Sequence, residues 1–220
     1  MEDYIIEIKN KLYKSGIRGV ALDIDETLSW TVGYWVEQMQ LNFGNPENLS
    51  VRQLIEKYRF TQNVPYWQTE EAIEWMDEHR NSNEIQELLP LIEYADKNVL
   101  EINKILPIVL YITTRPQSVV EGTKNWLSKH NFPDVEIIAR PPQIHVTEGN
   151  KWKAGVLEFL YPEVASIIDD NPGLVIHLPE HYKGTVYLYD NVETTRKDIA
   201  IIPCKTWDDV LRKIKDQNIV

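Results

Sequence analysis

The feature that most limits the fold of this chain is an apolar strand that ends abruptly in two carboxylates. Residues 19–22 read Gly-Val-Ala-Leu and run directly into Asp23, Ile24 and Asp25, with Thr27 close behind. A buried strand exposes charge only where it leaves the core, and ligands of open α/β sheets bind at the carboxyl ends of strands. The pair therefore indicates metal binding, or nucleophilic and acid–base chemistry. For the pair taken alone, a solvated strand exit is an equally good interpretation.

Apolar strands and amphipathic helices alternate along the rest of the chain. This alternation predicts an α/β fold with a Rossmann-like, mostly parallel sheet that is covered by helices on both faces. The sequence leaves open whether the last two strands are antiparallel. Further strands are expected at 108–113, 135–139, 164–168, 185–189 and 199–202, and helices at 3–15, 117–130, 151–161 and 207–216.

One connection is far longer than a crossover helix requires. About eighty residues separate the first strand from the second, and they hold four of the seven tryptophans. We expect a small helical cap at 29–105, inserted into a catalytic core made of 1–28 and 106–220. The loop at 63–67 is expected nearest the site, although Trp67 and Trp75 are more simply anchors of the cap core. Helical patterns within the cap lie at 51–58, 70–79, 84–94 and 96–105.

Length and composition narrow the class of protein. The chain has 220 residues, a formal net charge of −11 and one cysteine, Cys204, which excludes an internal disulfide framework or a cysteine-rich zinc site. The acidic balance argues against a nucleic-acid polymer as partner. No apolar run approaches the ~18 residues of a membrane span, and the N-terminus lacks a signal-peptide core. We therefore expect no membrane association and a cytoplasmic location, with the oligomeric state left open.

The strand predicted at 164–168 also ends in paired acids. The apolar run at 164–168 is followed by Asp169 and Asp170. Two such exits on one sheet bring like charges together, and these need a cation. Oxygen ligands without a Cys or His cluster favour Mg²⁺ over zinc or copper, so Mg²⁺ is the expected cofactor.

Two further stretches carry groups that suit an anion. The second predicted strand ends in Thr113, Thr114 and Arg115, where a hydroxyl and free backbone N–H groups precede a helix. A later helix has Lys151 and Lys153 in its first turn. Cations there oppose the helix dipole, so these lysines either lie at the surface or offset the charge of a bound anion. Three arginines, Arg59, Arg115 and Arg140, could bind an anion of the substrate. Each is more simply interpreted as a surface charge.

Taken together, these stretches resemble the four motifs of the haloacid dehalogenase (HAD) superfamily. In chain order they are Asp23-Ile-Asp25-Glu-Thr27, Thr113, a helix-initial lysine, and Asp169-Asp170, and they cover about residues 17 to 175. Because Asp occupies the second position of the first motif, the chain is similar to the phosphatase branch. The resemblance implies a HAD-like core with a helical cap after the first strand.

The resemblance also implies roles for individual residues. Asp23 would attack phosphorus and form an aspartyl-phosphate, and Asp25 would protonate the leaving alcohol and then activate water. Thr113 would bind a phosphate oxygen. Lys153 matches the family's Lys-x-x-x-Leu helix start better than Lys151 does. The implied Mg²⁺ ligands are Asp23, the Asp25 backbone carbonyl and Asp169, with Asp170 beside them.

A cap at this position implies a small, soluble phosphorylated metabolite as substrate, and a nucleoside monophosphate is one candidate among several. Two alternatives stay open: a phosphotransferase or mutase of the same superfamily, and a non-catalytic phosphate-binding protein on this fold. A phosphoaspartate receiver fits the order of the motifs poorly. The expected substrate contacts are Thr27, Trp30, Thr114 and Arg115.

Overall fold

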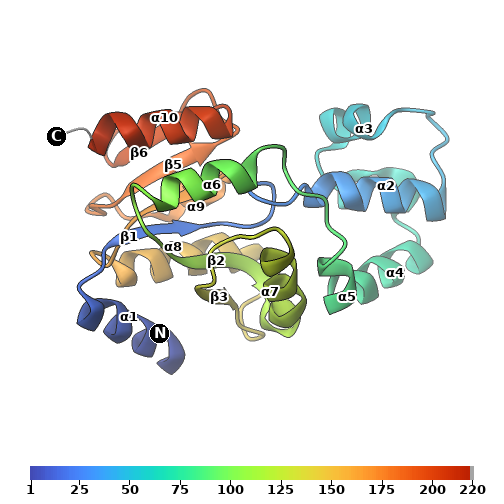
Figure 1. The fold of residues 1–220 in the computed structure, drawn as a ribbon. Helices are drawn as coiled ribbons and strands as arrows, with labels where there is room; N and C mark the ends of the chain where they lie inside the picture. Colours follow the sequence, from blue (N-terminus) through green and yellow to red (C-terminus); the bar gives the residue numbers. More distant parts are fainter. Residues whose placement is uncertain (219–220) are drawn as a thin grey trace.

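The computed structural model, which describes residues 1–218, has an α/β fold built around one six-stranded sheet (Figure 1). All neighbouring strands are parallel, in the order β3-β2-β1-β4-β5-β6. The predicted fold class is confirmed, and the last two strands, whose direction the sequence leaves open, are parallel as well. The strands are β1 (Gly19–Leu22), β2 (Ile108–Pro116), β3 (Glu136–Arg140), β4 (Val164–Asp169), β5 (Thr185–Tyr189) and β6 (Ala200–Cys204).

Helices cover both faces of the sheet because its central strands are apolar on both sides. All of β1 is buried, and its adjacent residues Ala21 and Leu22 enter hydrophobic clusters on opposite faces. The face of Ala21 is covered by α1 (Asp3–Ser15), α8 (Gly149–Leu160) and α9 (Pro172–His177). The face of Leu22 is covered by α6 (Ala95–Asn103), α7 (Val120–Lys129) and α10 (Trp207–Asn218). Short 3₁₀ turns at Gln117–Val119 and Val146–Glu148 lead into α7 and α8.

The long connection after β1 forms a helical insert beside the sheet (Figure 1). Its own hydrophobic cluster includes Trp67, which is 1% exposed and donates through Nε1 to Gly44 O at 2.9 Å. Trp75 packs edge-on against Trp35 and Phe43. Trp67 and Trp75 therefore anchor the insert, as the simpler interpretation predicts. The insert contains α2 (Thr31–Phe43), α3 (Val51–Tyr58), α4 (Glu70–Arg80) and α5 (Asn83–Gln86), with 3₁₀ turns at Thr61–Asn63 and Pro65–Trp67.

Parts of the insert differ from the expectation. The prediction of a helix at 84–94 is wrong, because α5 ends at Gln86. Pro90 has no backbone N–H for a helical hydrogen bond and disfavours the helical conformation of the residue before it. The sequence analysis does not predict helix α2, which the structure contains. Helix α6 lies inside the predicted cap range of 29–105, but it packs with α10 over the sheet. The division into core and cap stays a prediction, and residues 219–220 of the predicted core lie outside the described part.

The insert joins the core through two segments that pair with each other. Ser29 and Leu91 form an antiparallel bridge. Trp30 N–H donates to Pro90 O, and Ile92 N–H donates to Leu28 O, both at 2.8 Å. The chain thus leaves the core and returns to it at neighbouring positions. Among the described residues, no helix is both long and apolar enough to cross a membrane.

Candidate active site

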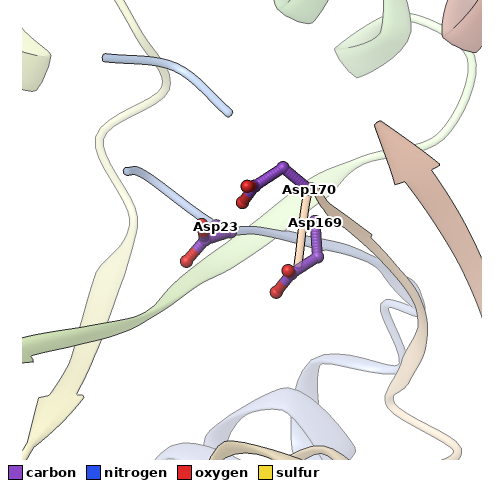
Figure 2. Close-up of side chains that lie close together, drawn as sticks. All are labelled: Asp23, Asp169 and Asp170. Atoms are coloured by element: carbon purple, nitrogen blue, oxygen red, sulfur yellow. The ribbon is translucent and has the colours of Figure 1, made fainter. Parts of the chain in front are cut away.

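The acidic residues at the ends of β1 and β4 meet at the middle of the sheet. The two strands are neighbours, and the order of strands reverses between them, which is where open α/β sheets bind ligands. Asp23 follows β1 and donates its backbone N–H to Ile168 O at 2.9 Å. Carboxylate oxygens of Asp23, Asp169 and Asp170 lie within 4.8 Å of one another. Figure 2 shows these three side chains close together at the strand ends.

Lys153 reaches this cluster from α8, which packs on the same face of the sheet as Ala21. Its side chain is 2% exposed, and its ammonium contacts Asp23 Oδ1 and lies 2.5 Å from Asp169 Oδ2. Lys151 instead extends outward toward Glu148, at 3.5 Å. Of the two lysines that begin the helix, Lys153 is therefore the one in the acidic cluster.

Burial sets the charge state of the acidic cluster. It raises the pKa of Asp23 to about 7, against the lowering effect of Lys153, and it raises the pKa of Asp170 well above the ordinary value. Oδ2 of Asp169 is buried, and the ammonium of Lys153 lies 2.5 Å from it. One ammonium among three close carboxylates leaves excess negative charge, which fits a hard divalent cation such as Mg²⁺.

Thr27 lies between the acids. Its hydroxyl is 3.3 Å from Asp23 Oδ2 and 3.4 Å from Asp170 Oδ1, and it accepts the backbone N–H of Asp170 at 3.2 Å. The carbonyl of Thr27 accepts a hydrogen bond from Trp207 Nε1 at 3.1 Å. Thr27 is fully buried, so these contacts make it an orienting group for the carboxylates. A direct contact between Thr27 and substrate has no support in this placement.

Asp25 is held by Arg115. Nε of Arg115 donates to both carboxylate oxygens at 3.0 and 3.1 Å, Nη2 donates to Oδ1 at 2.7 Å, and the Thr31 hydroxyl adds a bond at 2.6 Å. Burial raises the pKa of Asp25, but Arg115, Thr31 and Lys153 together outweigh it, so the pKa lies below its ordinary value. Arg115 also donates to Ser29 and Thr123. Its guanidinium, expected to contact substrate, is thus engaged by groups of the protein itself.

A cavity of about 380 Å³ lies over the acids, and the insert contributes part of its wall. The residues from the insert are Val32, Ile55, Arg59 and Phe60, which belong to α2, α3 and the turn after α3. The loop at 63–67, expected nearest the site, does not line this cavity. The core contributes the acids together with Thr114, Asn150, Lys153 and Asn191.

Two other predicted site residues lie off this cavity. Thr113 is fully buried, and its hydroxyl accepts the backbone N–H of Arg115 at 3.1 Å, whereas Thr114 is on the cavity wall. Trp30 lines a different cavity, and its ring lies so close to Gly33 that a Cβ there would be 2.1 Å from it. A role of Thr113 or Trp30 toward substrate stays a prediction.

Glu26 and Asn191 are among the residues of the cavity that the predicted site set does not contain. Glu26 has a φ of 56°, and its Oε1 accepts the N–H of Val32 at 2.6 Å at the start of α2; burial raises its pKa to about 7. Asn191 donates to Asp170 O at 3.0 Å and to Tyr189 O at 2.7 Å. Asn191 follows β5, so the rule that strand ends carry the site could have found it.

Comparisons with known proteins assign no family. No protein-family model and no curated protein matches the chain. Among solved structures, cytosolic 5'-nucleotidase IIIB bound to cytidine is similar at 16% identity, over 96% of this chain and 90% of that one, with a TM-score of 0.44. DsGPDH of Dunaliella salina is similar at 11% identity, over 97% of this chain and 37% of that one, with a TM-score of 0.46.

Proposed function

We propose that this protein hydrolyses the phosphate monoester of a small metabolite with the help of Mg²⁺. The observation that carries the proposal is the buried cluster of Asp23, Asp169 and Asp170, with the ammonium of Lys153 among them, at two adjacent strand ends. Such a cluster has one carboxylate for nucleophilic attack and others for a cation. The insert over the cluster suits a substrate small enough to be enclosed.

In this proposal Asp23 attacks the phosphorus atom, and the P–O bond to the alcohol breaks to leave an aspartyl-phosphate. Asp25 gives its proton to the departing alkoxide and, as a carboxylate, then takes one from the attacking water. The oxygen of that water bonds to phosphorus as the bond from phosphorus to Asp23 breaks, which releases inorganic phosphate. The contacts of Arg115 and Thr31 favour the carboxylate form of Asp25, which is the form needed for the second step. Proton donation in the first step requires those contacts to loosen.

Mg²⁺ would be held by Asp23, the backbone carbonyl of Asp25 and Asp169, with Asp170 beside them. When bound, it offsets the repulsion between the anionic nucleophile and the anionic phosphate. Lys153 holds the carboxylates of Asp23 and Asp169 in place and adds positive charge. Thr113 and Thr114 are the proposed phosphate-binding residues, through a hydroxyl and backbone N–H groups near the carboxyl end of β2.

The proposed substrate is a small phosphorylated metabolite, and a nucleotide remains one candidate. The proposed location is the cytoplasm. Transfer of the phosphoryl group to a second alcohol would use the same intermediate, so a test must follow release of inorganic phosphate as well as loss of substrate.

The test is hydrolysis of p-nitrophenyl phosphate and a panel of metabolite phosphates with and without Mg²⁺. Asp23→Asn should lower kcat/KM by roughly a thousand-fold or more, because nothing replaces the nucleophile. Asp134→Asn, which neutralises an exposed acid away from the cluster, should keep full activity. Acid-quenched wild type should carry one added phosphoryl group by mass spectrometry. Undiminished hydrolysis by Asp23→Asn would rule out this mechanism.

A further inference from the structure

A second cavity adjoins the one over the acids. It has a volume of about 370 Å³ and shares the lining residues Asp25 and Thr114 with the first cavity, so the two cavities meet at these residues. The core contributes the end of β2 and the loop after β3, and the insert contributes α2 and the end of α4. Its polar lining includes Thr31, Arg80, Arg115, Arg140 and His145.

The two cavities carry opposite charge. Six acidic side chains and two cations line the first cavity, whereas three arginines, one histidine and a single acid line the second. The acid is Asp25, which is paired with Arg115 at 2.7 Å, so those two charges offset each other. Arg140 remains without an acidic partner among the described residues, and Arg80 has Asp77 of its own helix 3.4 Å from Nε. The positive lining is opposite in sign to the net charge of −11 of the whole chain.

Arg140 is fixed in position without losing its charge. The side chain is half-buried at the end of β3, where Nε donates to Thr114 O at 3.0 Å and Nη1 donates to Ile144 O. Both partners are backbone carbonyls, which orient the guanidinium but do not neutralise it. Nη2 makes no hydrogen bond with any residue of the described part. An oriented guanidinium with a free donor is suited to a carboxylate or a phosphate.

Arg80 contributes the second cation from the insert. It ends α4, and Nε lies 3.3 Å from Met76 O and 3.4 Å from Asp77 Oδ1, both within the same helix. Its two terminal nitrogens form no hydrogen bond to the residues that the structure describes. Arg80 and Arg140 therefore line one cavity from the insert and from the core, and an anion between them would touch both parts.

We propose that the second cavity binds a second anionic group of the substrate, a carboxylate or a phosphate, while the phosphate to be cleaved lies over Asp23. The proposal rests on the proposed hydrolase function. It specifies the substrate class as a small phosphorylated acid or a bisphosphate. The Asp25–Arg115 pair forms part of the boundary between the two anionic groups, and Thr114 lies on both sides of it.

The test uses pairs of substrates that differ in one group. Glycerol 3-phosphate and 3-phosphoglycerate differ by CH₂OH against carboxylate, and sorbitol 6-phosphate and 6-phosphogluconate differ in the same way on a longer chain. Wild type should prefer the acid of at least one pair by about ten-fold or more in kcat/KM, the size expected of a charged hydrogen bond. Fructose 6-phosphate against fructose 1,6-bisphosphate tests phosphate as the second group. Equal kcat/KM values within every pair overturn the proposal.

Variants then test whether Arg80 and Arg140 cause the preference for the acidic substrate. Arg80→Met should bring the ratio within a pair close to one, and Arg80→Lys should keep part of it. Arg140→Met should act in the same direction, but it also loses the bonds to Thr114 O and Ile144 O. The polar contacts of the Arg80 side chain, to Met76 O and Asp77 Oδ1, lie within its own helix. Arg80→Met therefore remains a test of the proposal if Arg140→Met fails to fold. Arg212→Met, an exposed charge on α10, is the control and should leave every ratio unchanged. A wild-type ratio in Arg80→Met overturns the proposal.

A binding measurement separates this inference from the proposed function. If no phosphate monoester is hydrolysed, the hydrolase proposal fails. The anion site is then tested by calorimetric titration of the wild type with the same pairs of compounds in the presence of Mg²⁺. Tighter binding of the acid, reduced in Arg80→Met and kept in Arg212→Met, supports an anion site in the second cavity. Equal or undetectable binding of the two members overturns it.

Discussion

Lys153 is the residue on which the acidic cluster depends. Its ammonium lies between Asp23 and Asp169, and all three side chains are buried. Removing one partner of a buried ion pair leaves an uncompensated charge. The lysine is therefore expected to matter for folding as well as for hydrolysis.

Lys153→Met should lower the free energy of unfolding of the metal-free protein by about 3–5 kcal/mol, since two buried carboxylates lose their counter-charge. Added Mg²⁺ should recover part of this loss. Urea denaturation with and without Mg²⁺ measures both effects. Lys151→Met is the matched control, because Lys151 is exposed, and its effect should stay within about 0.5 kcal/mol. Equal destabilisation by the two variants would contradict the assignment of Lys153 to the cluster.

The acids of the cluster predict a link between pH and metal binding. The pKa of Asp23 is raised from 3.8 to about 7 in the fold, so the folded, metal-free protein keeps a proton that the unfolded chain releases. Its contribution to stability is therefore largest at low pH and is lost as the pH rises toward about 7. A cation competes with that proton. The rise in Tm caused by Mg²⁺ should be larger at about pH 8 than at about pH 5.5, by scanning fluorimetry, and equal rises would contradict this.

At the level of single residues, the sequence predicted positions along the backbone better than directions of side chains. Asp169 and Asp170 lie beside Asp23 because the carboxyl ends of adjacent parallel strands meet at one edge. Arg115 also lies at that edge, but its long side chain turns to the nearest buried acid, Asp25. Thr113 points into the core because alternate residues of a strand face opposite sides. Such choices depend on neighbours that are remote in sequence.

At the level of elements, α5 of the insert closely approaches α7 of the core. Gly122 of α7 lies so near α5 that a Cβ there would be 2.1 Å from Asn83 O. The side chain of Asn83 accepts the Gly122 N–H at 2.7 Å and donates to Ser118 O at 3.1 Å. These contacts fix one side of the insert against the sheet domain.

Gly122→Ala should lower the free energy of unfolding by about 1–3 kcal/mol, because the backbone of α5 must shift to admit a methyl group. The expected sign is opposite to the gain that alanine gives in an open helix. Gly155→Ala is the control: Gly155 lies within α8, and no atom is within 4 Å of the position of its Cβ. That variant should gain about 0.5–1 kcal/mol. Denaturant unfolding compares the two, and a gain in both would contradict the close approach.

Strands were easier to predict than the helices of the insert. Long apolar runs at β2 and β4 admit one interpretation, since both faces are buried. Helix α2 lacks a local start signal: Trp30 occupies its N-cap position, and the carboxylate that accepts the Val32 N–H comes from Glu26. Sequence rules search for a capping residue next to the helix, so a cap supplied by an earlier loop is missed.

At the level of the whole molecule, the candidate site is shared between two parts of the chain. Val32, Ile55, Arg59 and Phe60 complete a cavity whose floor is formed by acids of the core. The length of the connection after β1 predicted an inserted part, but α6 shows that its boundary depends on packing. Helix α6 has an apolar face that matches α10, and a sequence pattern does not say which neighbour an apolar face will meet.

A shared cavity predicts that ligand binding slows the motion of the insert. With Mg²⁺ and orthovanadate, amides of 55–60 should exchange hydrogen more slowly, because a bound anion contacts both parts of the molecule. Amides of α1, which packs on the sheet away from this cavity, should exchange at an unchanged rate. Mass spectrometry of peptides from the two regions compares the rates. Equal protection of both regions would indicate general stabilisation instead.

The pairing of Ser29 with Leu91 has a consequence for how such a chain can diversify. Because the insert leaves and returns at adjacent positions, its length is not constrained by the sheet. Residues could be added, removed or exchanged between these two points without moving β1 or β4 and the acids at their ends. The paired segments therefore allow the insert, and with it the proposed substrate contacts, to change separately from the acids at the strand ends.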